Sequence, residues 1–415
     1  MDLLSMDPAF QVAHMSARAY QRGLCAAFSG SISTRDENGN VWITPACKDL
    51  SALSREDIVS VSKSQLENVR AVDNNIAMHY SIYAVRPNIQ AVIHAFPPYL
   101  MAYGSMGKLP NISFLPSSKY RCETLSFVHF GSMRESLNDR LMHKAQLGHD
   151  CLLIENGGVV VIGEDLETAF LRLDELEAAA KLNFVLSAIG KPVIPSEKHM
   201  TMYMLRNFPH FDESAQISDD EQTLSLRKNM IDKIERLYQK NLFTPSSGTL
   251  SYRVDEDRFL ITPYGKDRFY LSEEDLILID KGKRECNKIP SRSAELCMHI
   301  YRKNPDIGCI LIAQPPYLMS FAVTETNFEP ARYAAGAELI GNLKRLPFGA
   351  SFMQPELTAK EVHNQASLLI SENDSIVVCG ANAEETFARL EWSENLAQSI
   401  CVAKQLDQSD RLQSN

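Results

Sequence analysis

Hydrophobic residues recur at helical spacing near the start of two long segments of the chain. Residues 7–24 (DPAFQVAHMSARAYQRGL) and 226–242 (LRKNMIDKIERLYQKNL) each predict an amphipathic helix. Short runs rich in β-forming residues follow each helix, such as VWITP after DENGN and RFLITP after DEDR. The pattern therefore predicts a helix followed by several short strands, and it does so twice.

Two further runs are apolar almost without interruption. Residues 89–96 (IQAVIHAF) and 307–314 (IGCILIAQ) are typical of strands that are covered on both faces. Beyond them, DCLLIENGGVVVIG and DSIVVCG predict another pair of strands, and each leads into a final helix. Together these elements predict an α/β fold in each half of the chain.

The two halves also share motifs at a nearly constant offset. Residues 28–45 (FSGSISTRDENGNVWITP) reappear as 246–263 (SSGTLSYRVDEDRFLITP), and PPYLM occurs at 97–101 and at 315–319, so the offset is 218. An offset this long indicates one fold duplicated. We expect domains at 1–205 and 224–415, joined through the polar, acidic stretch 206–223, which is either a linker or a short ordered strap.

Composition places few limits on function but excludes some classes. The 415 residues are 45% hydrophobic and 23% charged, as in an ordinary globular protein, and the net charge is -10. This charge disfavours a broad nucleic-acid surface and an anionic-membrane surface. No apolar run approaches the roughly 18 residues of a membrane span, and no signal peptide is evident. Nine scattered cysteines predict reduced core thiols, and we expect a cytoplasmic protein.

The order of these motifs resembles the class II aldolase/adducin family. The matching elements are SG-x-IS-x-R, ITP, Y-x-x-x-P-(N/D)-I, PPY, N-x-x-V-V-x-G and a final F-x-R, over about residues 7–190 and 225–405. The resemblance implies two tandem α/β/α domains, each with a central, largely antiparallel sheet. It also implies a four-fold assembly, so a homodimer of this tandem chain would form a pseudo-tetramer. A paralogue or another protein partner is left open.

The resemblance further implies a zinc site that this chain has lost. Family members hold zinc with three histidines and a glutamate, and zinc acts there as a Lewis acid. The matching positions read His94, Phe96, Gly157 and Asn75 in the first copy and Ile312, Gln314, Asp374 and Ser293 in the second. One histidine of six remains, so we expect no metal cofactor. We expect His94, at the vestigial metal position, to be a hydrogen-bonded core residue, and the alternative is a ligand or a base. Glu295 becomes the catalytic acid–base candidate only if its helix is two residues shorter than in the family. We expect His79 and His299 to be partly exposed helix residues.

The family's phosphate cradle is retained in the second copy alone. In the first copy, Cys47 and the pair Asp73–Asn74 replace the family's glycine and serines. Tight turns with free N–H groups, hydroxyls and an arginine suit an anion. The predicted ligand-binding residues are Ser247, Gly248, Thr249, Thr262, Gly265, Ser291 and Arg292. The alternative is that these residues are kept for turn geometry alone. The basic run 281–288 is expected to be a solvated turn rather than a docking patch.

Two functions follow from these observations. We expect a metal-free, non-catalytic member of the family that serves oligomeric scaffolding or binds a small phosphorylated or other anionic ligand. The alternative is a lyase (aldolase) or epimerase that acts on a sugar phosphate through a rebuilt site.

Overall fold

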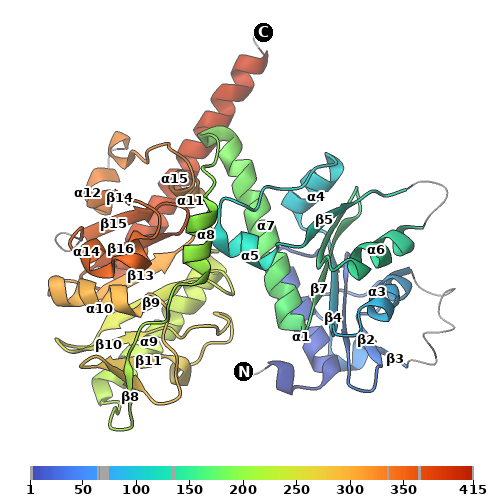
Figure 1. Cartoon of the computed structure of the whole chain (residues 1–415), viewed down its shortest axis with the longest axis horizontal. Helices are drawn as coiled ribbons and strands as arrows, with labels where there is room; N and C mark the ends of the chain where they lie inside the picture. Colours follow the sequence, from blue (N-terminus) through green and yellow to red (C-terminus); the bar gives the residue numbers. More distant parts are fainter. Residues whose placement is uncertain are drawn as a thin grey trace. The chain divides into compact units, whose positions relative to one another are not determined.

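The computed structural model describes residues 3–62, 65, 74–131, 136–333, 336–362 and 366–413. The chain divides into two compact units (Figure 1). The N-terminal unit comprises residues 2–112 and 117–183, and the C-terminal unit comprises residues 113–116 and 184–415.

The N-terminal unit begins with the predicted amphipathic helix. Asp7 caps this helix, because its carboxylate accepts a hydrogen bond from the Phe10 N–H at 3.1 Å. The helices of the unit are η1 (Leu3–Ser5), α1 (Pro8–Gln21), η2 (Arg55–Asp57), α3 (Asn74–Val85), α4 (Pro98–Ser105), α5 (Pro116–Arg121), α6 (Leu137–Gln146) and most of α7 (Leu166–Ile189). The strands are β1 (Ser31–Arg35), β2 (Val41–Ile43), β3 (Val59–Val61), β4 (Ala91–Ala95), β5 (Leu125–Val128), β6 (Cys151–Ile154) and β7 (Gly158–Gly163).

The seven strands form one sheet in the order β3-β2-β1-β4-β7-β6-β5, and only the β5–β6 pair is parallel. Helices α3 and α6 pack their apolar side chains on one face of this sheet, and α1 and α4 contact the other face. The predicted continuous apolar strand is β4, which lies at the centre between β1 and β7. Its residues are apolar apart from His94 because helices cover both of its faces.

The C-terminal unit contains a longer set of elements. Its helices are α8 (Glu197–Met204), α9 (Glu221–Gln239), η4 (Glu273–Asp275), α10 (Ala294–Lys303), α11 (Pro316–Ala322), η5 (Pro330–Arg332), α12 (Gly336–Ile340), α13 (Ala350–Met353), α14 (Pro355–Ala359) and α15 (Ala383–Gln413). The strands are β8 (Asp212–Ser214), β9 (Thr249–Arg253), β10 (Arg258–Ile261), β11 (Ile277–Asp280), β12 (Lys283–Glu285), β13 (Cys309–Ala313), β14 (Asn342–Leu346), β15 (Ala366–Ser371) and β16 (Ser375–Gly380).

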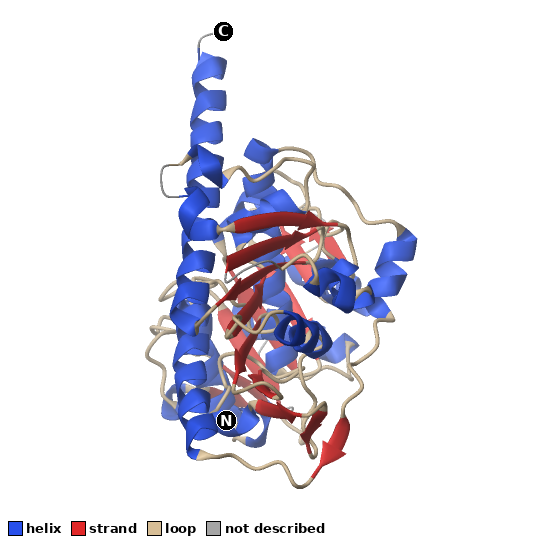
Figure 2. Cartoon of the chain, turned by 90° about the vertical axis from the view of Figure 1, so that its left-hand side faces the viewer, coloured by secondary structure: helices blue, strands red, loops and turns tan. Residues whose placement is uncertain are grey.

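The sheet of the C-terminal unit repeats the strand order of the first. Its order is β14-β15-β16-β13-β9-β10-β11-β12-β8, and the first seven strands correspond one by one to the N-terminal sheet. Helices α10 and α14 pack on one face, while α9, α11 and α15 contact the other. Figure 2 shows the strands beside the long helix α15, which leads to the C-terminus. The prediction of two α/β/α domains with largely antiparallel sheets is therefore confirmed. Within the described residues, the first sheet shows no strand that corresponds to β12 or β8.

The arginine of the repeated IS-x-R motif has the same structural role in both units. Arg35 donates hydrogen bonds to the carbonyl oxygens of Tyr83, Pro87 and Ile89 at the end of α3, the last at 2.6 Å. Arg253 repeats this arrangement at the end of α10, where it binds three carbonyl oxygens, including that of Ile307 at 2.7 Å. The final carbonyl groups of a helix need such partners, so this motif stabilises the fold.

Residues 205–220, which connect α8 to α9, form an ordered strap on the C-terminal unit. Its strand β8 pairs in parallel with β12, and the Phe211 side chain is buried in the core. Arg284 of β12 holds the strap through Glu213 at 2.8 Å and through the carbonyl oxygen of Phe211 at 3.1 Å. The basic run 281–288 thus includes the β12 strand of the sheet, and its Lys288 forms an ion pair with Glu285.

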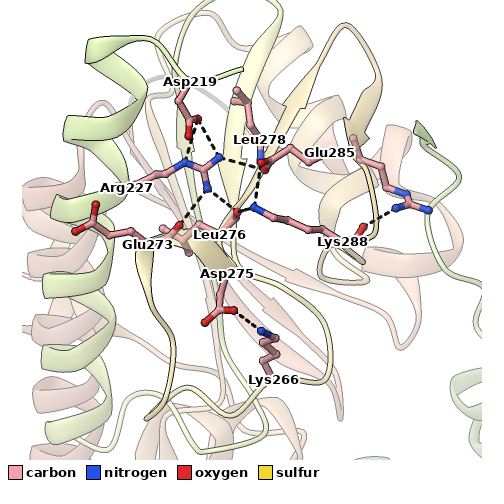
Figure 3. A network of polar contacts seen from close by, with 10 residues as sticks. Asp219, Arg227, Lys266, Glu273, Asp275, Leu276, Leu278, Glu285 and Lys288 are labelled. Atoms are coloured by element: carbon pink, nitrogen blue, oxygen red, sulfur yellow. Dashed lines mark hydrogen bonds and ion pairs between the residues drawn. The ribbon is translucent and has the colours of Figure 1, made fainter. Parts of the chain in front are cut away.

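The far end of the strap is fixed by a buried arginine on α9 (Figure 3). The Arg227 side chain is 3% exposed and binds the carboxylates of Asp219 at 2.9 Å and Glu285 at 3.1 Å. It also donates to the carbonyl oxygens of Glu273 at 3.1 Å and Leu276 at 2.5 Å. The strap is therefore held along its length by a strand pair, a buried phenylalanine and charged hydrogen bonds.

Candidate functional site

A polar cavity of about 130 Å³ lies in the C-terminal unit. Its walls come from the turn 246–249 that leads into β9, the loop that carries Tyr264 and Arg268, and the residues just before α10. The end of β13, the start of β16, α13, and the segment that contains α8 and the strap complete the lining. Five of the predicted ligand-binding residues line it, namely Ser247, Gly248, Thr249, Ser291 and Arg292. The Thr249 and Ser291 hydroxyl groups lie 2.7 Å apart, so the turn and the start of α10 are hydrogen-bonded to each other.

Three predicted site residues lie outside the cavity lining. Thr262 is fully buried behind the turn, where its hydroxyl accepts a hydrogen bond from the Leu250 N–H at 3.4 Å. Gly265 has a left-handed φ of +73° in the following loop. Glu295 lies on the exposed side of α10 with its carboxylate 4.0 Å from the His299 ring. Thr262 is nevertheless bonded to the lining, because its carbonyl oxygen accepts a hydrogen bond from the Ser291 N–H at 3.0 Å. Gly265 and Glu295 do not line the cavity.

Gly248 gives the turn a shape that other residues would not permit. Its φ is +124°, and an added Cβ atom would lie 2.4 Å from the ring of Phe243. Its carbonyl oxygen accepts a hydrogen bond from Arg268 Nε at 2.7 Å. The glycine is therefore required by a close approach as well as by the backbone conformation.

The predicted Arg292 is placed by aromatic side chains. Its guanidinium lies over the rings of Tyr264, at 4.7 Å, and Phe208 of the strap, at 4.8 Å, and Nη2 donates to the Tyr264 hydroxyl at 3.1 Å. Nε is buried and has no hydrogen-bond partner within the part of the chain that the structure describes. A buried, charged N–H group without a partner is costly, so this group is suited to an anionic ligand.

Two further arginines at the cavity were not predicted from the sequence. Arg268 lies beneath the turn, where burial lowers its pKa to about 10. Arg206 comes from the strap and stacks over the ring of Tyr203 at 3.9 Å. Its Nη1 is 4.0 Å from an oxygen of Asp374, while its buried Nε has no partner among the described residues.

The positions that would hold zinc in the second copy have become a hydrogen-bonded polar cluster. Ile312 contributes hydrocarbon to the lining, and the Gln314 amide donates to the carbonyl oxygen of Asp374 at 2.6 Å. The Asp374 carboxylate accepts hydrogen bonds from Ser351 at 2.8 Å and Ser375 at 3.2 Å. One carboxylate beside an isoleucine and an amide does not provide the three ligands that zinc requires, so these residues do not fit the metal.

The corresponding positions of the first copy do not fit zinc either. His94 Nε2 is 2.8 Å from the carbonyl oxygen of Gly157, and its ring lies 4.6 Å from that of Phe96. Burial lowers the pKa of His94, as expected for a neutral imidazole that is hydrogen-bonded inside the protein. Of the two residues that replace the family's serines in this copy, Asp73 lies outside the described residues.

One histidine was placed wrongly by the sequence interpretation. His79 is fully buried, with its two ring nitrogens each 2.7 Å from a hydroxyl, of Ser31 and of Ser33. Burial lowers its pKa to about 3. The expectation of a partly exposed residue was wrong because α3 packs this side chain against β1. His299, by contrast, is partly exposed as predicted.

Among the described residues, none of the helices combines the length and the apolar character that a membrane crossing needs. The same residues contain no group of three or more His, Cys, Asp or Glu side chains that could hold a metal ion. All nine cysteines are free, and seven of them are buried, whereas Cys47 is exposed and Cys286 is half-buried.

Comparison with known proteins identifies relatives for each half of the chain. A protein-family model described as "Class II Aldolase and Adducin N-terminal domain" matches residues 10–184 and 228–401. L-fuculose phosphate aldolase of Methanococcus maripaludis is 24% identical over 190 residues, which are 45% of this chain and 98% of that protein. The 3-oxo-tetronate 4-phosphate decarboxylase of Haemophilus influenzae is 29% identical over 175 residues, which are 40% of this chain and 82% of that protein.

Solved structures give similar matches to about half of the chain. The L-fuculose 1-phosphate aldolase from Glaciozyma antarctica has a TM-score of 0.40 and 18% identity, over 47% of this chain and 79% of that one. YgbL from Escherichia coli, a putative aldolase/epimerase/decarboxylase, has a TM-score of 0.39 and 21% identity, over 46% of this chain and 95% of that one.

Proposed function

Because this chain belongs to the class II aldolase and adducin family and contains two copies of its domain, we propose that the second copy binds a small phosphorylated ligand without a metal ion. The observation that supports this proposal is Arg292, whose buried Nε lacks a partner among the described residues and lies at a cavity lined by the Ser247–Gly248 turn. Hydroxyls, a glycine turn and a charged guanidinium together suit a phosphate group.

The binding test uses glycerol phosphate and the two tryptophans of the chain. Trp42 lies in the N-terminal unit and Trp392 in the C-terminal unit, and the chain contains no other tryptophan. In a Trp42→Phe background, fluorescence therefore reports the unfolding of the C-terminal unit. Ligand at about 100 times its Kd should stabilise this unit by about 2.7 kcal/mol, and thus raise its Tm by roughly 5–10 °C.

Arg292→Gln should remove this rise in Tm. The matched control is Arg332→Gln, because Arg332 is 78% exposed, belongs to the same unit and does not line the cavity. A Tm that glycerol phosphate leaves unchanged in the wild-type protein would contradict the proposal.

We also propose that the protein has no catalytic zinc. Ile312 and Gln314 stand where two zinc-binding histidines would be, and the Gln314 amide is already hydrogen-bonded to the Asp374 carbonyl oxygen. Protein purified without chelator should contain well under one equivalent of zinc per chain by elemental analysis. Tightly held, stoichiometric zinc would contradict this part of the proposal.

The remaining part of the proposal is a role in assembly. A homodimer of the tandem chain would bring four copies of the domain together in a ring, as the family resemblance implies. Native mass measurement should then give twice the mass of one chain. A monomer at micromolar concentration would exclude this part and leave the ligand proposal intact.

The alternative is a lyase or epimerase that acts on a sugar phosphate. The names of the relatives, an aldolase and a decarboxylase, favour it. Glu295, the acid–base candidate, is outside the cavity lining, and its carboxylate faces His299. Sustained turnover of dihydroxyacetone phosphate with an aldehyde, lost in Glu295→Gln, would support this alternative over the non-catalytic proposal.

A further inference from the structure

The strap, which lies between the two segments that match the family model, contributes Arg206 to the cavity lining and places Phe208 beside Arg292. Arg206 and Phe208 both belong to residues 205–220, and the strap's strand β8 extends the sheet beyond the seven strands that the two units share. Phe208 packs edge-on against Tyr264 at 4.7 Å, and its ring lies beside the Arg292 guanidinium. The strap therefore helps to position Arg292, and it adds Arg206 to the cavity.

Arg206 is arranged as a binding group rather than as part of a stable ion pair. Its guanidinium is stacked over Tyr203 at 3.9 Å and lies 5.6 Å from the Phe352 ring. The closest Asp374 oxygen is 4.0 Å away, too far for a hydrogen bond. Nε is buried and has no partner within the described part of the chain.

The charges around the cavity match a doubly charged anion. Its lining contains three arginines, Arg206, Arg268 and Arg292, and one carboxylate, Asp374. Arg268 is already bonded to the carbonyl oxygens of Gly248 and Lys266 and interacts with the Asp267 carboxylate, so Arg206 and Arg292 are the two cations available to a ligand. A phosphate monoester carries close to two negative charges above its second pKa of about 6, whereas a phosphate diester carries one. An uncompensated buried charge is costly, so such a site should favour the ligand that neutralises it.

We infer that Arg206 of the strap is a specificity-determining residue that makes this cavity select the dianion of a phosphate monoester. This inference rests on the proposed phosphate site and adds to it the residue that recognises the second charge. It assigns the strap a role in ligand selection, in addition to its structural connection of the two copies.

The test compares three small anions by titration calorimetry. Methyl phosphate becomes a dianion as the pH rises through about 6, dimethyl phosphate stays a monoanion, and sulfate stays a dianion. Because roughly a tenth of methyl phosphate is dianionic at pH 5, its affinity for the wild-type protein should rise about tenfold between pH 5 and 7.5. Sulfate controls for titration of the protein, so its affinity should change much less over the same range.

Arg206→Gln should abolish the preference for the dianion. We expect about tenfold weaker binding of methyl phosphate at pH 7.5, a lost or much smaller rise with pH, and dimethyl phosphate affinity within twofold of wild type. Arg206→Lys should restore part of the preference because it restores the charge without the planar stacking. Arg332→Gln is again the matched control, and Trp392 fluorescence checks that the unit is folded.

The possible failures are distinguishable. If the wild-type protein binds none of the three anions, the proposed phosphate site is wrong. If it binds methyl phosphate and Arg206→Gln leaves both the affinity and the pH dependence unchanged, the phosphate site stands and the role of Arg206 is refuted.

Discussion

Replacing Arg227 with methionine should strongly destabilise the C-terminal unit. The arginine side chain is 3% exposed and binds two carboxylates and two carbonyl oxygens (Figure 3). Methionine would leave Asp219 and Glu285 without this cation and the carbonyl groups without a donor. Removing one member of a buried ion pair costs about 3–5 kcal/mol. The carboxylates are 26% and 20% exposed and can recruit water, so we expect the lower end of this range, about 3 kcal/mol.

The assay is thermal unfolding followed by Trp392 fluorescence in the Trp42→Phe background. For a unit of this size, a loss of about 3 kcal/mol corresponds to a fall in Tm of roughly 6–12 °C. Lys266→Met is the matched control, because Lys266 also pairs with an aspartate, Asp275, but is 60% exposed. An exposed pair contributes about 1 kcal/mol or less. If Arg227→Met lowers the Tm no more than Lys266→Met does, the reasoning about the buried network is refuted.

Two further predictions concern the stability of each unit. The pKa of His79 is lowered from 6.5 to about 3 by burial, so the N-terminal unit should lose stability as the pH falls below 6.5, by up to about 1.4 kcal/mol per pH unit. His79→Gln should flatten this pH dependence of the unfolding free energy between pH 6.5 and 5. The measurement is urea unfolding followed by Trp42 fluorescence in a Trp392→Phe background, and an unchanged slope of the unfolding free energy with pH would contradict the prediction. Gly248→Ala should cost about 1–3 kcal/mol through backbone strain and contact with Phe243, and should weaken glycerol phosphate binding. Gly265→Ala is the milder control, because a Cβ atom added at Gly265 would meet no other atom within 4 Å. If Gly248→Ala and Gly265→Ala lower the stability equally, the reasoning about the contact with Phe243 is contradicted.

The fold was predictable because the repeated motifs are the residues that hold it together. Arg35 and Arg253 each bind the carbonyl groups at the end of a helix, so their presence in both copies indicates the same backbone arrangement. The left-handed conformation of Cys47, with φ of 59°, likewise matches that of Gly265, with φ of 73°. Residues that are repeated for such structural reasons indicate the fold whether or not the protein still catalyses a reaction.

The site was predictable only in part. The turn residues were found because they repeat a pattern, but Arg206 lies between the two segments that match the family model, 10–184 and 228–401, so no repeated motif pointed to it. Arg268 was missed although a signal existed: the equivalent position is Leu50, and both residues donate the same backbone hydrogen bond, to Ala27 and Pro245. An arginine in place of a buried leucine marks a place where the copies have diverged. The burial of His79 also had a signal, because its equivalent in the second copy is Cys297.

The position of the strap determines how the second copy can be studied by truncation. A fragment that begins at residue 224, where the repeated sequence resumes, would keep every repeated element of that copy. It would nevertheless lack β8, Asp219 and Arg206, and so would lose an edge strand, a partner of Arg227 and one wall of the cavity. A shortened version intended to report on the ligand should therefore start upstream of α8, even though similarity between the halves suggests a later starting point.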